Sequence, residues 1–326
     1  MSTVTFYDII TTIMKQSFHI LCIIPMCAAL SCNAESLEPG IAIANARANC
    51  GGISETFKSM KTMAQVNTAV TGIGTAAGAG AVAVGIAKAN IDKEIEKLIR
   101  DVQERELEKG NTELSVDEGQ DFIDATIALK RNVTTSETNK SKLEQQSKNL
   151  GNWRTGLLAG NTATNIAGTI IAANNRVGTD LRTQLNKCVE SLHDLQASKM
   201  QAQINNADAN TIQKMNNIIT ACREYDTLDI DKIDNKAKGA TISSGTGIAV
   251  GAAGTITSAV ANTDKIRNDN TDAGMTKEKN LNTASNVLAA GATVASGVAT
   301  VFNAQQISVL NRAQQIATQC IEALNQ

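Results

Sequence analysis

The sequence predicts an all-α protein built from long helices, and three observations support this. Proline occurs only at Pro25 and Pro39, so residues 40–326 lack the residue that most often ends a helix. Aromatic residues make up only 2% of the chain, so its apolar surface consists of Ala, Val, Ile and Leu. Four uncharged segments rich in glycine and alanine recur at regular distances from four cysteines. The 326 residues are enough for two average domains.

Residues 1–34 have the features of an export signal peptide. Lys15 precedes an apolar core over residues 18–30, and small residues occupy positions −3 and −1 of a cleavage site after Ala34. The core is too short for a standard membrane span. There are two alternatives. One is lipidation at Cys32, although the preceding residues match a lipoprotein site imperfectly, and the other is a segment that is not cleaved. A cleaved signal directs the chain to the cell envelope, in the membrane or periplasm, or to secretion.

Cleavage after Ala34 leaves four cysteines: Cys50, Cys188, Cys222 and Cys320. An even number in an exported chain predicts disulfides, with buried free thiols or a zinc site as alternatives. The midpoints between successive cysteines fall on or beside turn-like clusters of Gly, Asn and Asp. This pattern is typical of four helices running up, down, up and down, with all cysteines at one level. The level alone allows Cys50–Cys188 with Cys222–Cys320, or Cys188–Cys222 with Cys50–Cys320. We favour the first pairing because it joins each half of the chain to itself.

The chain also shows an internal duplication. Residues 148–160 (KNLGNWRTGLLAG) align with residues 279–291 (KNLNTASNVLAAG). We therefore expect two duplicated, long antiparallel helical hairpins that form an elongated four-helix bundle with a Gly/Ala-rich belt. The first hairpin is expected over residues 35–205, with a long coiled-coil tip, and the second, shorter one over residues 206–326.

The small-residue segments are expected to pack against one another. They centre near residues 78, 160, 249 and 293, each 27 or 28 residues from the nearest cysteine, so they lie abreast in such a bundle. Glycine costs a helix about 1 kcal/mol relative to alanine, and small residues four apart let helices approach closely. The predicted helix-packing residues are the pairs Gly74 and Gly78, Gly156 and Gly160, and Gly247 and Gly251.

The same segments are candidates for contact with membrane lipid. Residues 67–87, 155–175, 239–263 and 280–311 carry no charge, and their shared length is about 25 Å at 1.5 Å per residue. A hydrocarbon core is about 30 Å thick. Trp153 and Phe302 fall near the two edges, where interfacial aromatic residues sit. Against this, the segments are only mildly apolar and would insert only if their polar groups faced each other. A soluble bundle with Ala- and Gly-lined seams is the alternative.

A charged extension follows the first of these segments. A coiled-coil seam is predicted by the spacing of Ile91, Ile95, Leu98 and Val102, which alternate four and three residues apart. Leu143, in the returning segment of the hairpin, is at the same level as Ile95. We expect this arm, residues 91–150, to project about 30 Å beyond the second hairpin. It is the candidate surface for a protein partner. A solvated helical arm without a partner is the alternative.

Few residues carry catalytic potential. His193 is the only histidine after residue 34, and Gly72, Gly74 and Gly78 imitate a dinucleotide fingerprint without the strand that should precede it. The net charge of −2, with both signs interspersed, does not favour nucleic acid. We expect no enzymatic activity, cofactor or metal. The sequence allows a homo-oligomer. The sequence favours an exported helical-hairpin protein that is associated with or inserts into a membrane, as an envelope component or pore-like effector. The alternative is a soluble periplasmic or secreted structural or interaction protein that presents its coiled-coil arm.

Overall fold

The computed structural model describes residues 37–110, 119–267 and 271–326, with only the helical backbone described within residues 102–137. These residues form helices joined by turns, with no strand among them, which confirms the all-α class. The predicted signal peptide, residues 1–34, lies outside the described residues.

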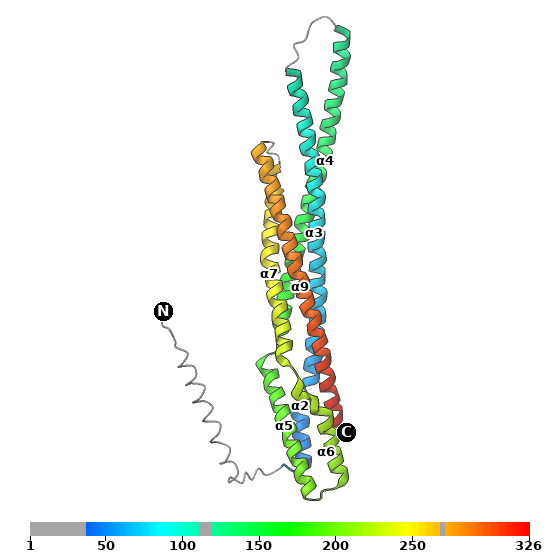
Figure 1. Ribbon diagram of the computed structural model, residues 1–326, viewed down its shortest axis with the longest axis vertical. Coiled ribbons are helices and arrows are strands. Elements are labelled where there is room, and N and C mark those ends of the chain that lie inside the picture. Colours follow the sequence, from blue (N-terminus) through cyan, green and yellow to red (C-terminus); the bar gives the residue numbers. More distant parts are fainter. Residues whose placement is uncertain (1–36, 111–118, 268–270) are drawn as a thin grey trace, which may run out of the picture.

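The chain forms long helices joined by short turns (Figure 1). In order they are α2 (Pro39–Cys50), α3 (Ile53–Gly110), α4 (Gly119–Asn174), α5 (Thr179–Ile204), α6 (Ala209–Cys222), the 3₁₀ turn η1 (Arg223–Thr227), α7 (Ile230–Ala261), the short α8 (Asp264–Arg267) and α9 (Asp272–Asn325). The lengths of α3, α4 and α9 follow from the absence of proline after Pro39, which itself begins α2.

Four of these helices, α3, α4, α7 and α9, lie side by side along the molecule (Figure 1). Helix α3 contacts α4 and α9, and α7 also contacts α4 and α9, so each helix has two main neighbours. Figure 1 shows α3 and α4 continuing past the ends of α7 and α9. This continuation contains the arm expected from the sequence.

At the opposite end, α2 and α6 pack against α9, and α5 packs against α2 and α6. Helix α2 leads into α3 across Gly51 and Gly52, and α5 follows α4 after a short turn. The turn from α5 to α6 contains Asn206 with φ of 53°, a left-handed conformation that asparagine tolerates better than most residues. It ends at Asp208, which caps α6 by accepting a hydrogen bond from the backbone N–H of Thr211.

Two disulfides join neighbouring helices at this end. Cys50 at the end of α2 pairs with Cys188 of α5, and Cys222 at the end of α6 pairs with Cys320 of α9. This is the pairing favoured from the sequence, and it takes the place of the free thiols and the zinc site considered above. All four cysteines are buried in one apolar cluster.

That apolar cluster is the larger of two hydrophobic cores. It is formed by α2, α5, α6, the beginning of α3 and the end of α9, and it includes Phe57, Leu195, Ile218 and Leu310. The second core is a single layer of Ala81, Leu158 and Ala289 further along the four long helices. Between these two cores the interior is lined by small and polar side chains, which makes this region the candidate functional site.

Candidate functional site: a polar interior within an apolar belt

The uncharged segments of the four long helices lie abreast. We call residues 67–87, 155–175, 239–263 and 280–311 together the belt. Asn67 of α3 donates a hydrogen bond to Asn303 of α9, and each is 17 residues from Cys50 or Cys320 in the sequence. A Cβ added at Gly74 would meet Thr164 of α4, and these positions are each 24 residues from Cys50 or Cys188. Residues at equal distance from the cysteines therefore meet across the helix contacts.

The interior of the belt is polar. Its buried polar side chains, each no more than 1% exposed, are Asn67, Thr71, Asn161, Asn165, Ser244, Ser258, Ser285, Ser296, Asn303 and Gln306. Many of them bond between helices. The Asn165 amide donates to Ser296 Oγ at 2.9 Å, and Thr300 Oγ1 donates to Thr71 Oγ1 at 2.9 Å. The polar groups that make these segments only mildly apolar thus face one another inside the belt.

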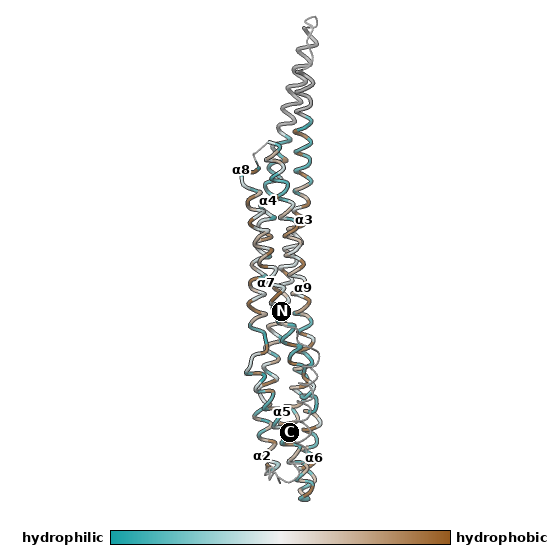
Figure 2. Tube along the Cα trace, turned by 60° about the vertical axis from the view of Figure 1, so that its left-hand side comes forward, coloured by the Kyte–Doolittle hydropathy of each residue, from teal (hydrophilic) through white to brown (hydrophobic). Residues whose placement is uncertain are grey.

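The exterior of the belt is apolar. Ile73, Ile256 and Val294 are each more than 60% exposed, and further isoleucines and valines of all four helices are also exposed. Figure 2 shows hydrophobic residues along the middle of the long helices. A soluble protein places its large aliphatic side chains inside and its asparagines outside, because burying a polar group costs stability and burying apolar surface gains it. The belt has the opposite distribution.

Four of the six predicted packing glycines lie at helix contacts. A Cβ at Gly74, Gly78, Gly247 or Gly251 would approach Thr164, Thr293, Asn165 or Thr162, respectively, to less than 3 Å. The missing side chain at these positions lets α3 and α7 lie close to α4 and α9.

Gly156 and Gly160 differ from the expectation. Both are exposed, and a Cβ at either position would meet nothing within 4 Å. The interior face of α4 instead follows Arg154, Leu158 and Asn161, which alternate four and three residues apart, and the two glycines lie on another face. Two close-contact glycines of α4 that sequence reasoning missed continue this alternation: Gly168, which meets Thr71, Asn67 and Ser244, and Gly151, which meets Asn262.

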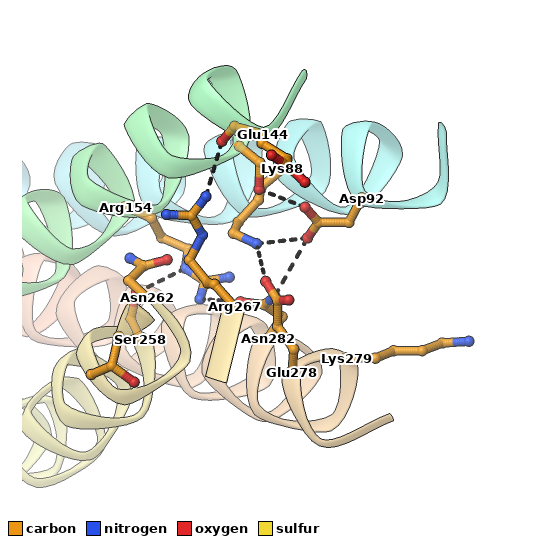
Figure 3. A network of polar contacts seen from close by, with 12 residues as sticks. Lys88, Asp92, Glu144, Arg154, Ser258, Asn262, Arg267, Glu278, Lys279 and Asn282 are labelled. Carbon is orange, nitrogen blue, oxygen red and sulfur yellow. Dashed lines mark hydrogen bonds and ion pairs between the residues drawn. The ribbon is translucent and has the colours of Figure 1, made fainter. Parts of the chain in front are cut away.

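A network of charged side chains around the buried Lys88 borders the belt where the arm begins (Figure 3). The side chain of Lys88 is fully buried, and its Nζ lies 2.6 Å from Asp92 Oδ2 and 2.9 Å from Glu278 Oε1. Ser147 Oγ of α4 donates to the other oxygen of Asp92 at 2.6 Å. The network therefore ties α3 to both α4 and α9.

Arg154 is the second fully buried cation of this region. Its guanidinium donates to Ser258 Oγ at 3.1 Å, to Asn286 Oδ1 at 3.1 Å and to Asn282 Oδ1 at 2.9 Å (Figure 3). The planar guanidinium presents its donors in a fork, so one side chain serves acceptors on both α7 and α9. Sequence reasoning missed Lys88 and Arg154. The sequence did contain a signal for both residues, because each is the first charged residue beyond an uncharged segment.

The predicted edge aromatics lie in different surroundings. Trp153 is 69% exposed beside Arg154. Phe302 packs against Gly239 of α7, and Lys236 Nζ lies 5.6 Å from the centre of its ring. Both residues are therefore near opposite ends of the belt, and only Trp153 projects outward.

The other residues considered in the sequence lie outside the belt. His193 is on the surface, with Nε2 3.8 Å from Asp226 Oδ2. Ile95 and Leu143 of the arm are partly buried, whereas the side chain of Val102 is outside the description. Among the described residues, no group of three or more His, Cys, Asp or Glu side chains is placed to hold a metal ion. A cavity of about 620 Å³ lies at the base of the arm, lined by charged residues of both signs and by Ile95, Ile99 and Met275.

Comparisons with protein-family models, curated proteins and solved structures found no match to this chain. By length and composition, two described helical stretches, Pro39–Asp101 and Asp272–Asn325, are apolar enough to cross a membrane. Most residues in the most apolar part of each stretch are not buried inside the protein.

Proposed function

We propose that the protein is an exported, non-enzymatic component of a cell envelope whose belt lies in a membrane. In this proposal the four long helices form a bundle of two duplicated hairpins. The observation that carries it is the inverted distribution of the belt, with asparagine and serine buried inside and isoleucine and valine exposed outside.

The energetics of this distribution favour lipid around the belt. Fully burying an Ile or Val side chain is worth about 1.5–3 kcal/mol. The belt carries aliphatic side chains that are 41–67% exposed: Ile73, Ile86, Ile166, Ile170, Ile242, Ile256, Val260, Val287, Val294, Val298 and Val301. At about 1 kcal/mol for each side chain, transfer of this surface from water to lipid stabilises the membrane-bound protein by about 10 kcal/mol. Polar groups paired inside the bundle do not oppose this transfer, because they stay with their partners.

The dimensions of the belt agree with a bilayer. Residues 67–87 of α3 and 155–175 of α4 each span about 30 Å as a helix, which is the thickness of a hydrocarbon core. Lys88 and Arg154 follow these segments at one end, and Arg176 follows at the other. Charged residues thus bound the belt on both sides: Lys88 and Arg154 are buried and bonded to partners inside the protein, whereas Arg176 is exposed, where headgroups and water would solvate it.

The disulfides orient the protein in this proposal. Disulfides form in oxidising compartments, so the end with Cys50 and Cys222 lies on the extracytoplasmic side. The arm then extends from the other face of the membrane. There it is the candidate site for a protein partner.

A second candidate function is a soluble structural protein that presents the arm. It is favoured by the continuation of α3 and α4 beyond α7 and α9 (Figure 1), and by the conventional apolar cluster at the disulfide end. In that case the exposed isoleucines and valines would meet water or other copies of the chain.

Fluorescence of Trp153 separates the two functions, because it is the only tryptophan of the chain and is exposed at the belt edge. The purified protein is mixed with phosphatidylcholine vesicles whose acyl chains are brominated at a shallow or a deep position. A membrane-embedded belt predicts quenching, stronger for shallow bromines. Unquenched fluorescence, together with a monodisperse protein in buffer without detergent, would overturn the membrane proposal.

A matched pair of substitutions tests the same proposal. Ile73 lies in the middle of the belt exterior at 62% exposure, and Ile204 lies at the end of α5, outside the belt, at 72%. Lysine in a bilayer centre costs about 2.5–3.5 kcal/mol, so Ile73→Lys should shift the protein toward the carbonate-extractable fraction. Ile204→Lys should not. Equal behaviour of the two variants would contradict a lipid-facing belt.

A further inference from the structure

The first turns of α9 are held to the rest of the protein mainly by polar contacts. The large apolar side chains of residues 272–288 are partly buried or exposed, and the first fully buried apolar side chain of the helix is Ala289. Segments with few buried apolar contacts are the ones that open locally while the rest of a protein stays folded. The polar contacts at this end therefore decide whether the beginning of α9 stays attached to α3.

The central contact is the ion pairing of Lys88 (Figure 3). Its side chain is fully buried, and its Nζ lies 2.6 Å from Asp92 Oδ2 and 2.9 Å from Glu278 Oε1, which joins α3 to α9. Arg154 is equally buried, but in the described part of the chain its guanidinium donates to neutral side-chain oxygens. Burial lowers the pKa of Arg154, and the negative charges of Asp92 and Glu278 oppose this shift. Two carboxylates therefore balance two buried cations.

The carboxylates and the cations differ in their access to solvent. Asp92 and Glu278 line the cavity of about 620 Å³ at the base of the arm, and their side chains are 28% and 21% exposed, whereas that of Lys88 is not exposed. Protons from solvent therefore reach the carboxylates without any movement of the helices. None of the other charged residues that line the cavity pairs with Lys88: Lys93, Glu96 and Arg100 of α3, Glu144 of α4, Arg267 of α8, and Asp272 and Lys279 of α9.

Protonation of the two carboxylates removes the charge balance. Lys88 and Arg154 keep their charges in acid, so neutral side chains at Asp92 and Glu278 leave two buried cations without a counter-charge. A buried ion pair that loses one partner is strongly destabilising, because the remaining charge is both desolvated and unpaired. We propose that these four residues form an acid-sensitive latch, which releases the beginning of α9 from α3 and opens the base of the arm. The latch is closed while both carboxylates are ionised, and its contribution to stability is lost as the pH falls.

The opening is expected to end at the layer of Ala81, Leu158 and Ala289. This layer joins α3, α4 and α9 by apolar contacts, which do not titrate. Beyond it, the belt interior is held by hydrogen bonds between uncharged groups, such as Asn67 with Asn303. The latch depends only on contacts within the protein, so it is independent of the proposed membrane location.

Two nitroxide labels across the contact between α3 and α9 test the latch in the full chain with its disulfides intact. Cysteines that replace Glu94 and Lys277 carry the labels, because both residues are exposed and neither belongs to the latch. We expect dipolar coupling between the labels at about pH 7 and its loss at about pH 3, below the ordinary carboxyl pKa. A control pair at the exposed residues Val66 and Ala304, on the other side of the apolar layer, should stay coupled at both pH values. Unchanged coupling of the first pair in acid would overturn the proposal, and so would loss of both couplings together, which would show general acid unfolding.

Substitutions separate the loss of charge balance from other effects of acid. Asp92→Asn combined with Glu278→Gln mimics the protonated carboxylates, so the first label pair should lose its coupling already at pH 7. Adding Lys88→Met removes one buried cation, so the coupling should return at pH 7 and persist in acid. If the double variant keeps its coupling at pH 7, or if Lys88→Met does not restore it, charge balance does not control the contact and the latch is refuted.

Discussion

Two glycine-to-alanine substitutions should have opposite effects on stability, because only one glycine lies at a helix contact. At Gly160 a Cβ meets nothing within 4 Å, so Gly160→Ala should gain the full helix propensity, about 1 kcal/mol. At Gly78 the Cβ would lie 2.3 Å from Thr293 Oγ1, 2.5 Å from Asn161 Nδ2 and 3.2 Å from Thr293 Cα. The last atom is backbone, so rotating a side chain cannot remove the conflict.

The cost at Gly78 follows from the groups that must move. Thr293 Oγ1 is held by its 2.8 Å hydrogen bond to the Ala289 carbonyl, and α9 must shift to make room. Overpacking of this kind costs about 1–3 kcal/mol, from which the gain in propensity is subtracted. Gly78→Ala should therefore be about 1–3 kcal/mol less stable than Gly160→Ala.

Denaturant titrations of both variants in one mild detergent, followed by far-ultraviolet circular dichroism with the disulfides intact, measure this difference. If the two substitutions raised the free energy of unfolding equally, α3 and α9 would not be in close contact at Gly78. That result would contradict the close packing of helices in the belt.

Three further perturbations test other parts of the structure. Arg154→Leu leaves acceptors on α7 and α9 without their donor and removes a buried cation, so unfolding titrations should show a loss of about 3–5 kcal/mol, with Arg154→Gln intermediate. Replacing Cys50 and Cys188 together by serine opens a loop of 138 residues and should cost about 5 kcal/mol, whereas an unchanged unfolding midpoint would show that this disulfide contributes nothing. The hydrogen bond from Arg176 lowers the pKa of Asp234, so its stabilisation is present above the ordinary carboxyl pKa and is lost as the pH falls through the lowered value. Asp234→Asn should therefore show a smaller drop in thermal midpoint between about pH 5 and pH 2 than the unsubstituted protein does.

The sequence predicted the helical class from composition and spacing, whereas the spacing of the cysteines left two disulfide pairings open, of which the favoured one, joining each half to itself, is present. The absence of proline after residue 39 allows long helices, and equal distances from the cysteines place Asn67 opposite Asn303. The export signal, the partner of the arm and the oligomeric state stay predictions.

The face of the helix on which a residue lies was harder to predict than its position along the helix. Glycines four residues apart satisfy a packing pattern on any face of a helix, so Gly156 and Gly160 could not be distinguished from Gly74 and Gly78 by spacing alone. The face of α4 is set by the alternation that contains Arg154, and a charged residue is usually assigned to the surface. Its burial depends on acceptors from α7 and α9, which are more than 100 residues away in the sequence.

The position of the disulfides has a consequence for biogenesis. Both bonds join residues within the same half of the chain, Cys50 to Cys188 and Cys222 to Cys320. Each covalent link can therefore form as soon as its own half has emerged into an oxidising compartment. In the proposed export, N-terminus first, oxidation can lock the leading half before Cys222 arrives, so Cys50 and Cys188 are already paired and cannot pair with cysteines of the second half. The final step of this proposed route is the docking of two cross-linked halves.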